Sequence, residues 1–169
     1  MKILDTRRSV REYSDKVVSD KDIKKILDAA MQAPSARNQQ PWEYLVIKDE
    51  QKKEKLASLV PAMRMAKEAS FLIIFLANKT RITAPLYYEQ DMASTTTIAM
   101  LEARSLGIGS VWCGGYPNMD RVNIIREVFD IKDENYEPFS VVCFGYPKTD
   151  EVFKKAKRFD KARIHNEVL

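Results

Sequence analysis

The run Phe-Leu-Ile-Ile-Phe-Leu-Ala at residues 71–77 is the feature that most restricts the fold of this chain. Apolar residues in unbroken succession, bounded by polar ones, predict a strand that is covered on both of its faces. A sheet built around such a strand needs helices on each side, and apolar residues at helical spacing supply them without a strict strand–helix–strand order. We expect strands at 43–48, 71–77, 110–113 and 139–144, and helices at about 19–33, 50–59, 61–68, 84–106 and 120–129.

The segment 84–106 is the longest expected helix, and Gly107 ends it. Its apolar residues leave little polar surface on any side, so the helix should be both central and part of an interface. On a monomer it would expose a large apolar patch, which favours a homodimer. The residues concerned are Met92, Ala93, Ile98, Ala99, Leu101, Ala103 and Leu106.

The composition is that of an ordinary soluble globular protein. The chain has 169 residues, 45% of them hydrophobic and 31% charged, which favours a single domain over residues 1–169 with a real core. The net charge of +4 is small and acidic residues are interspersed, so we expect no nucleic-acid partner. Residues 1–5 lack an apolar signal core and no run approaches the ~20 apolar residues of a membrane span. We therefore expect no membrane partner and a cytoplasmic location.

Cysteine and histidine give no sign of a metal site or of a hydrolase. Cys113 and Cys143 each lie in a strand-like apolar run, which favours buried thiols over a disulfide. His165 stands alone in a basic tail, so we interpret it as a surface or interface residue rather than a general base. With one histidine and two distant cysteines, no metal is implied.

The cluster Arg7-Arg8-Ser9-Val10-Arg11 places three guanidinium groups and a hydroxyl within five residues, and we expect it just before a helix. Arginine offers a planar fork of donors that matches phosphate oxygens, and the serine hydroxyl adds another donor. Taken alone, the cluster could equally be a solvated basic face. As a binding site, it would hold a phosphate dianion without a glycine loop.

A second polar cluster spans residues 34–42, Pro-Ser-Ala-Arg-Asn-Gln-Gln-Pro-Trp, between an expected helix and an expected strand. Its amides and hydroxyl can both donate and accept hydrogen bonds, which suits the edge of a heterocycle such as a flavin pyrimidine. Trp42 is better explained as a packing anchor. No Walker motif occurs, and Gly107-Ile108-Gly109 lacks the third glycine of a dinucleotide fingerprint. A phosphate clamp and an edge-reading loop together predict a phosphorylated cofactor.

Both clusters, at this spacing, resemble those of the nitroreductase family of FMN flavoproteins. The resemblance extends over nearly the whole chain, including Gly114-Gly115-Tyr116-Pro117 and the basic C-terminal stretch. It implies an α+β fold of three layers (α/β/α) with a central mixed sheet flanked by helices. It also implies a homodimer in which a C-terminal arm, about residues 152–169, wraps the partner subunit.

The resemblance further implies tightly bound, non-covalent FMN, with NAD(P)H as a transient reductant. A nitroaromatic, quinone or similar small acceptor would then be reduced in a second half-reaction, a ping-pong mechanism. The chemistry would reside on the flavin N5, so no catalytic side chain is assigned. Binding without turnover, as an FMN store or sensor, is the alternative. A weak nucleic-acid binder using the basic tail is disfavoured because the tail does not interleave aromatic residues with its cations; beyond Phe153 it has only Phe159.

The family pattern assigns each cofactor-binding position. Arginines and serine of the first cluster would bind the FMN phosphate and ribityl chain, and part of the second cluster would approach from the other subunit. Two glycines would allow close backbone approach to the ring, and the tail would add a cation to the phosphate, with Lys155 as a further option. The residues are Arg7, Arg8, Ser9 and Arg11; Pro34, Ser35 and Ala36 from the partner; Asn38 and Gln40 near the ring or ribityl chain; Gly114 and Gly115; and Lys157 and Arg158.

Overall fold

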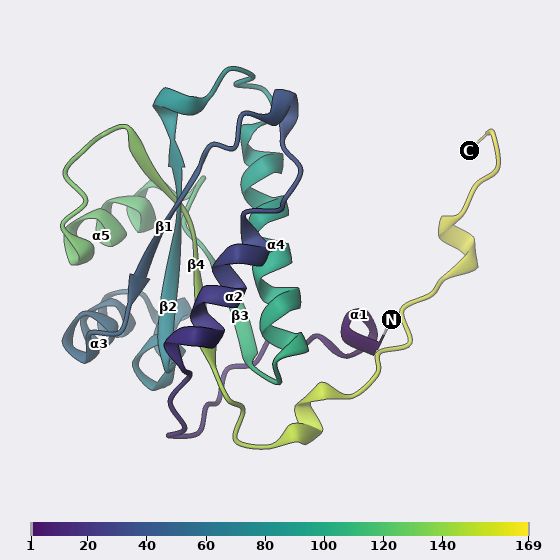
Figure 1. Ribbon diagram of the computed structural model, residues 1–169, viewed down its shortest axis with the longest axis horizontal. Coiled ribbons are helices and arrows are strands. Elements are labelled where there is room, and N and C mark those ends of the chain that lie inside the picture. The colour runs from purple at the N-terminus through teal and green to yellow at the C-terminus, as the bar shows by residue number, and fades with distance from the viewer. Residues whose placement is uncertain (1, 169) are drawn as a thin grey trace.

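A computed structural model describes residues 2–168 of the chain as a four-stranded sheet between two layers of helices (Figure 1). The strands are β1 (Trp42–Ile47), β2 (Phe71–Asn78), β3 (Gly109–Gly114) and β4 (Tyr136–Gly145), in the order β1-β2-β4-β3. The expected strands are all present, each within one to three residues of its predicted ends. The three-layer α+β architecture is confirmed.

The sheet differs from the expected mixed sheet, because neighbouring strands pair antiparallel throughout. β2 and β3 run in the same direction, but β4 lies between them and is antiparallel to both. Within the described residues, parallel pairing is confined to one isolated bridge, between Ser9 and Ser110. Because β4, the last strand in the sequence, lies between β2 and β3, these two strands do not pair with each other and the described sheet has no parallel strand pair.

β2 is the centre of the core, and all eight of its residues are buried, as the unbroken apolar run predicts. Its side chains alternate between two apolar clusters, one on each face of the sheet. On one face, the ring of Phe71 stacks on that of Phe144 at a centroid distance of 4.9 Å. Trp42 is buried in the same cluster, in agreement with its interpretation as a packing anchor.

Helices α2 (Asp20–Ala30) and α4 (Tyr88–Ser105) cover this face. The Ser19 hydroxyl accepts from the Asp22 N–H and so caps α2. α4 begins four residues later than expected: Pro85 disfavours a helical conformation at Ala84, and residues 85–87 form a turn before the helix. Gly107, with φ of 75°, follows its C-terminal end as predicted. One side of α4 is buried in the core, whereas Ile98 and Leu101 on another side are half-buried.

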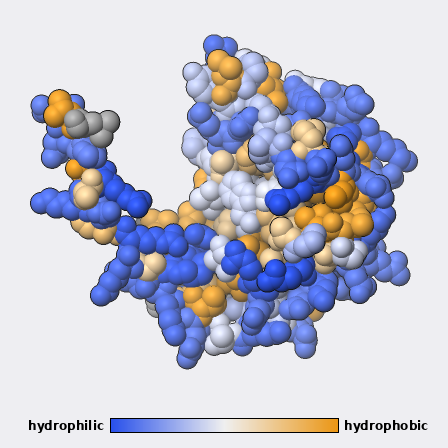
Figure 2. Space-filling view, turned by 180° about the vertical axis from the view of Figure 1, so that it is seen from behind, coloured by the Kyte–Doolittle hydropathy of each residue, from blue (hydrophilic) through white to orange (hydrophobic). Residues whose placement is uncertain are grey.

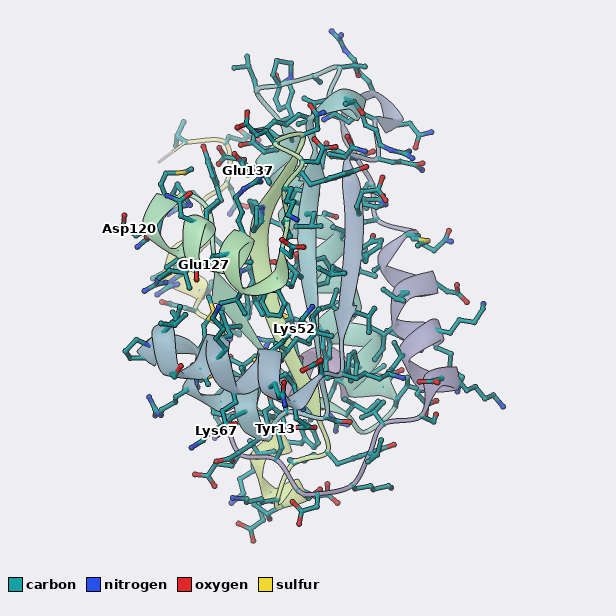
Figure 3. All side chains as sticks on the ribbon, turned by 90° about the vertical axis from the view of Figure 1, so that its left-hand side faces the viewer. Tyr13, Lys52, Lys67, Asp120, Glu127 and Glu137 are labelled. Carbon is teal, nitrogen blue, oxygen red and sulfur yellow. The ribbon has the colours of Figure 1, made fainter. Side chains whose placement is uncertain are left out.

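The opposite face carries α3 (Glu50–Leu59), the 3₁₀ segment η2 (Pro61–Glu68) and α5 (Met119–Phe129), which Figure 3 views from outside. All three lie where the sequence predicts them. Lys53 on α3 is buried, and its ammonium donates to the Ala69 carbonyl at 2.5 Å and to Glu50 at 2.9 Å. Cys113 and Cys143 lie under this layer as buried free thiols.

The remaining elements are short: α1 (Lys2–Thr6), η1 (Ala36–Asn38), η3 (Lys79–Arg81), η4 (Asp150–Phe153) and η5 (Lys161–Arg163). The arginine cluster follows α1 instead of preceding a helix, so that expectation is wrong; the next helix starts only at Asp20. Beyond η4 the C-terminal arm stands away from the body and is mostly hydrophilic (Figures 1 and 2). Among the described residues, no helix is long and apolar enough to cross a membrane.

Candidate functional site

The segment after α1 is held against the edge strand β3. The Val10 N–H donates to the Ser110 carbonyl at 2.9 Å, and the buried Tyr13 hydroxyl donates to the carbonyls of Val10 and Cys143. Gly109 permits this approach, because a Cβ there would lie 2.7 Å from Cγ2 of Val10. The arginines on either side of Val10 therefore have a fixed backbone.

Arg8 links the segment after α1 to the start of the C-terminal arm. Its guanidinium donates to the carbonyls of Arg7 (2.5 Å) and Asp5 (2.9 Å) and to the carbonyl of Lys154 in the C-terminal arm. A planar fork of donors can serve several acceptors at once, which an ammonium group cannot do with the same geometry. Arg8 thus brings the arm to the first cluster.

Arg7 lies among like charges. Burial lowers the pKa of its guanidinium, and the positive charges of Arg158 and Arg8 lower it further. None of the described ion pairs includes any of these three arginines. The nearby carboxylate of Asp5 is paired with Lys155 instead. Three cations without an ion pair of their own favour the binding of an anion, which would relieve their mutual repulsion.

The arm completes this cationic corner. A cavity of about 430 Å³ is lined by Arg8, Lys157, Arg158 and Phe159 together with residues of α1. Lys155 instead forms an ion pair with Asp5, with its Nζ 3.3 Å from Oδ2. Of the three cations that the sequence offers in the arm, Lys157 and Arg158 remain available to an external anion, and Arg158 is the one that acts on Arg7.

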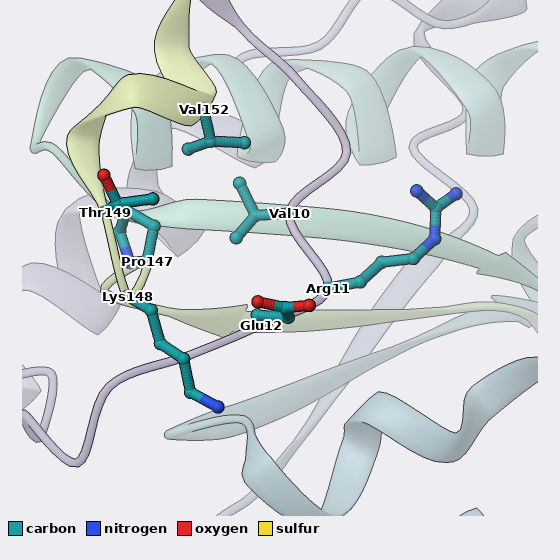
Figure 4. A pocket seen from close by; sticks show the side chains of 7 residues that line it. All are labelled: Val10, Arg11, Glu12, Pro147, Lys148, Thr149 and Val152. Carbon is teal, nitrogen blue, oxygen red and sulfur yellow. The ribbon is translucent and has the colours of Figure 1, made fainter.

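Arg11 lies apart from that corner. It lines a separate cavity of about 230 Å³, and its side chain extends away from Pro147 and Val152, toward which Val10 points (Figure 4). Ser9 is exposed beside it, and its carbonyl accepts from Arg11 at 3.5 Å. The pKa of the Cys113 thiol is lowered first by a hydrogen bond with Cys143 and also by the charge of Arg11, which places Arg11 toward the Gly114 end of β3.

Residues 34–41 form a strained loop. Arg37, Asn38 and Gln40 have φ of 53°, 53° and 44°, a left-handed conformation that costs a non-glycine residue about 1–2 kcal/mol. The Ser35 hydroxyl accepts from the Gln40 N–H at 3.0 Å, and the Gln40 side chain donates to that of Asn38 at 3.1 Å. The two amides that the sequence singles out are therefore adjacent and exposed.

Two residues that the sequence analysis did not single out hold this loop. Gln39 is buried and donates to Asp91 on α4 at 2.5 Å, and Asp91 also accepts from the Ala36 N–H at 2.9 Å. Asp91, but not Gln39, also lines a cavity of about 320 Å³ with Pro34, Ser35, Ala36 and Tyr87. No local signal separates Gln39 from its neighbour Gln40, since the contact with Asp91 spans 52 residues.

The glycine pair at the end of β3 has two different explanations. A Cβ at Gly115 would lie 2.9 Å from the Pro138 carbonyl oxygen and 3.2 Å from that of Phe139, so packing on β4 requires glycine there. A Cβ at Gly114 would have no heavy atom within 4 Å. Contacts within the chain therefore do not explain why position 114 is a glycine, and the space beside it is open to a ligand.

The two clusters lie at opposite ends of α4 (Figure 1). Asp91 binds the 34–41 loop near the start of the helix, and Arg104 near its end donates to Thr6 of α1 at 3.1 Å. Thirteen residues separate Asp91 from Arg104, which is about 20 Å along a helix axis. The cationic corner and the 34–41 loop of one chain do not converge.

The whole sequence was compared with the profiles of known protein families. The sequence profile of the nitroreductase family matches residues 4–65 and 60–146, most of the chain. The chain belongs to the nitroreductase family. No group of three or more potential metal ligands was found among the residues that the structure describes.

Similar proteins span the full length of this nitroreductase-family chain. A protein of Archaeoglobus fulgidus with the provisional name NADH dehydrogenase/NAD(P)H nitroreductase is 44% identical over an alignment 169 positions long, gaps included, which covers 99% of this chain and 97% of that protein. A Clostridium acetobutylicum structure, provisionally an NADH oxidase, is 41% identical with a TM-score of 0.94 and 99% of each chain covered. An FMN-dependent nitroreductase of Clostridium difficile is 26% identical, with a TM-score of 0.87 and 99% and 98% coverage.

Proposed function

We propose that this protein is an FMN-dependent oxidoreductase that passes electrons from NAD(P)H to a small acceptor. The observation that carries the proposal is the gathering of Arg7, Arg8 and Arg158 without a described carboxylate partner, in a chain of the nitroreductase family. Such a corner suits the phosphate of FMN. The relatives support the activity, since they are named for NAD(P)H-linked oxidoreductases, one of them FMN-dependent.

The residues present fit FMN at three places. Arg7, Arg8 and Arg158 would hold the phosphate, with Lys157 and the Ser9 hydroxyl nearby. Asn38 and Gln40 would bind polar atoms of the ring or ribityl chain, and Gly114 would let the backbone approach the ring face. Arg11, between the cationic corner and the Gly114 end of β3, would contact the ribityl chain.

The complete site requires a second copy of the chain. A ligand at the Arg7 corner of one chain cannot also meet that chain's 34–41 loop, because the two lie at opposite ends of α4. In a symmetric homodimer the loop of the partner would supply the missing wall, with its Pro34, Ser35 and Ala36. The arm beyond residue 152 would wrap that partner, which gives Phe159 (84% exposed) a surface to cover.

Bound FMN would supply the two-electron chemistry that links NAD(P)H to the acceptor in two half-reactions. The protein would neutralise the phosphate, hold the ring edge by amide contacts and leave one ring face open. An open face without a shaped pocket favours small flat acceptors such as nitroaromatics and quinones. A cytoplasmic location is part of the same proposal.

An absorption spectrum tests the cofactor. The purified protein, reconstituted with FMN, should be yellow, and replacing both Arg7 and Arg8 by alanine should release the colour. Arg64→Ala is the matched control, because Arg64 is exposed on η2, across the sheet from α4. A folded protein that takes up no FMN contradicts the proposal, and equal retention by the double variant contradicts the phosphate assignment.

Mixing the reconstituted protein with NAD(P)H anaerobically tests the enzyme. Rapid bleaching, followed by reoxidation with a quinone or nitroaromatic, is the expected result. Parallel lines in a plot of reciprocal rate against reciprocal NAD(P)H concentration, at several acceptor concentrations, would show the two half-reactions. Bound FMN that NAD(P)H bleaches only at a negligible rate would instead identify an FMN store or sensor.

A further inference from the structure

Asp91 is a buried carboxylate on the first turn of α4, and only 5% of it is exposed. Its Oδ1 accepts from the Ala36 N–H at 2.9 Å and its Oδ2 accepts from the Gln39 side chain at 2.5 Å. None of the ion pairs among the described residues includes Asp91. Hydrogen bonds from the 34–41 loop therefore stabilise this charge in place of a cation.

Gln39 cannot turn its amide around. The backbone N–H groups of Thr83 and Ala84 both donate to its Oε1 at 2.8 Å, so its Nε2 must face Asp91. The residue at position 91 thus has to accept two hydrogen bonds, one from the Ala36 N–H and one from the Gln39 side chain. A carboxylate can do so, whereas an asparagine could satisfy only one donor and would point an N–H at the other.

These contacts hold a backbone that would not keep its shape alone. Left-handed residues at 37, 38 and 40 persist only where the surroundings over-determine them. Gln39 lies between Asn38 and Gln40, and its fixed side chain sets the backbone from which both exposed amides project. Ser35 supplies the other tie, through the Gln40 N–H.

We infer that Asp91, acting through Gln39 and the Ala36 N–H, is a positioning residue that presents Asn38 and Gln40 to the cofactor. The inference rests on the proposed FMN function. Its role is indirect, because Asp91 itself is directed into the loop. The specific requirement is that the residue at position 91 has two acceptors, one for the Ala36 N–H and one for the side-chain donor at position 39.

That requirement can be tested by reversing the pair. Asp91→Asn leaves two donors facing each other, and Gln39→Glu brings two carboxylates together. The double variant D91N/Q39E restores the pattern at unchanged net charge. Its amide at position 91 accepts from the Ala36 N–H and donates to the carboxylate at position 39, which still accepts from Thr83 and Ala84.

The measurements are the FMN dissociation constant, by fluorescence titration of the apoprotein, and amide hydrogen exchange at Ala36. We expect D91N to weaken FMN binding about tenfold, the effect of one lost buried hydrogen bond, and to expose the Ala36 amide. The double variant should return to within about threefold of wild type, since the lost bond is restored. Lys53→Met is the control, because it removes a buried, hydrogen-bonded charge on the opposite face of the sheet.

The outcomes separate this inference from the function on which it rests. Wild-type protein that does not bind FMN would contradict the proposed function. Wild-type protein that binds FMN, with D91N binding equally well, would overturn the inference alone. So would a double variant no better than D91N, or a K53M variant that loses FMN affinity as much as D91N does. If D91N does not fold, recovery of binding and of Ala36 protection by the double variant, relative to Q39E, decides the question.

Discussion

The guanidinium of Arg8 donates to the backbone carbonyl of Lys154, a contact between residues 146 apart in the sequence. It fixes the start of the C-terminal arm beside α1, and Arg158 further along the arm lies close enough for its charge to lower the pKa of Arg7. The first arginine cluster is therefore part of the structural support of the arm as well as a candidate phosphate site.

Replacing Arg8 by lysine should loosen the attachment of the C-terminal arm and weaken the candidate phosphate site. Two nitrogens of the guanidinium serve the three carbonyls, and the single ammonium nitrogen cannot occupy both positions. We expect trypsin to cleave the arm faster, and FMN affinity to fall about tenfold. A time course of limited proteolysis and a fluorescence titration measure the two effects, with Arg64→Lys as the control. Unchanged cleavage would show that the Arg8 contact does not hold the arm.

Substitution of the two adjacent glycines by alanine should give opposite results. Gly115→Ala brings its Cβ against the Pro138 and Phe139 carbonyls and should destabilise the fold by about 1–3 kcal/mol. Gly114→Ala meets nothing in the chain and should melt like wild type, yet weaken FMN binding by crowding the ring. Thermal denaturation and FMN titration of both variants distinguish these causes. Full FMN affinity in Gly114→Ala would show that the ring does not approach that position.

Mixing two defective homodimers should restore FMN binding if the site is shared between subunits. One variant lacks Arg7 and Arg8, and the other lacks the amides of Asn38 and Gln40. A heterodimer then contains one intact site and one with both defects, so random exchange restores about a quarter of all sites. If each site came from one chain, every site in the heterodimer would carry a defect. No recovery after confirmed subunit exchange would therefore refute the two-chain site.

The N-terminus of α2 should contribute to acid sensitivity. Hydrogen bonds from Lys25 and Ser19 lower the pKa of the Asp22 carboxyl below its ordinary value. A lowered pKa in the folded state stabilises the protein above the unfolded value, about 3.9, and this stability is lost as pH falls through the folded value. Urea unfolding of wild type and Asp22→Asn between about pH 6 and 2 should converge at the acid end. Parallel pH profiles would contradict this linkage.

The sequence was sufficient where local chemistry decides the structure. The strand buried on both faces at 71–77 and the end of the long helix at Gly107 each follow from a short stretch of sequence, and both are confirmed. It was insufficient where distant residues decide. The antiparallel sheet depends on where β4 inserts, and the role of Gln39 depends on Asp91, whose position beside the loop follows from the packing of α4.

Arg11 shows that distant contacts also decide where the side chains of a single sequence motif lie. Three arginines in five residues predict one basic cluster, but the chain between Arg8 and Arg11 is bound to β3 through the Val10 N–H, and the side chains before and after that contact lie in different places. Arg7 and Arg8 meet the arm, whereas Arg11 lines another cavity with Pro147 and Val152. The assignment of the individual ligands stays a prediction that the variants above can test.

The insertion of β4 between β2 and β3 also has a consequence for biosynthesis. Until residues 136–145 leave the ribosome, β3 has no other strand of the sheet with which to pair, and the buried run of β2 is covered along one edge only. The emerging polypeptide would keep this apolar edge open through most of translation, and the sheet would close late, by long-range contacts that form slowly. Chains released before residue 145 should accordingly be prone to aggregate.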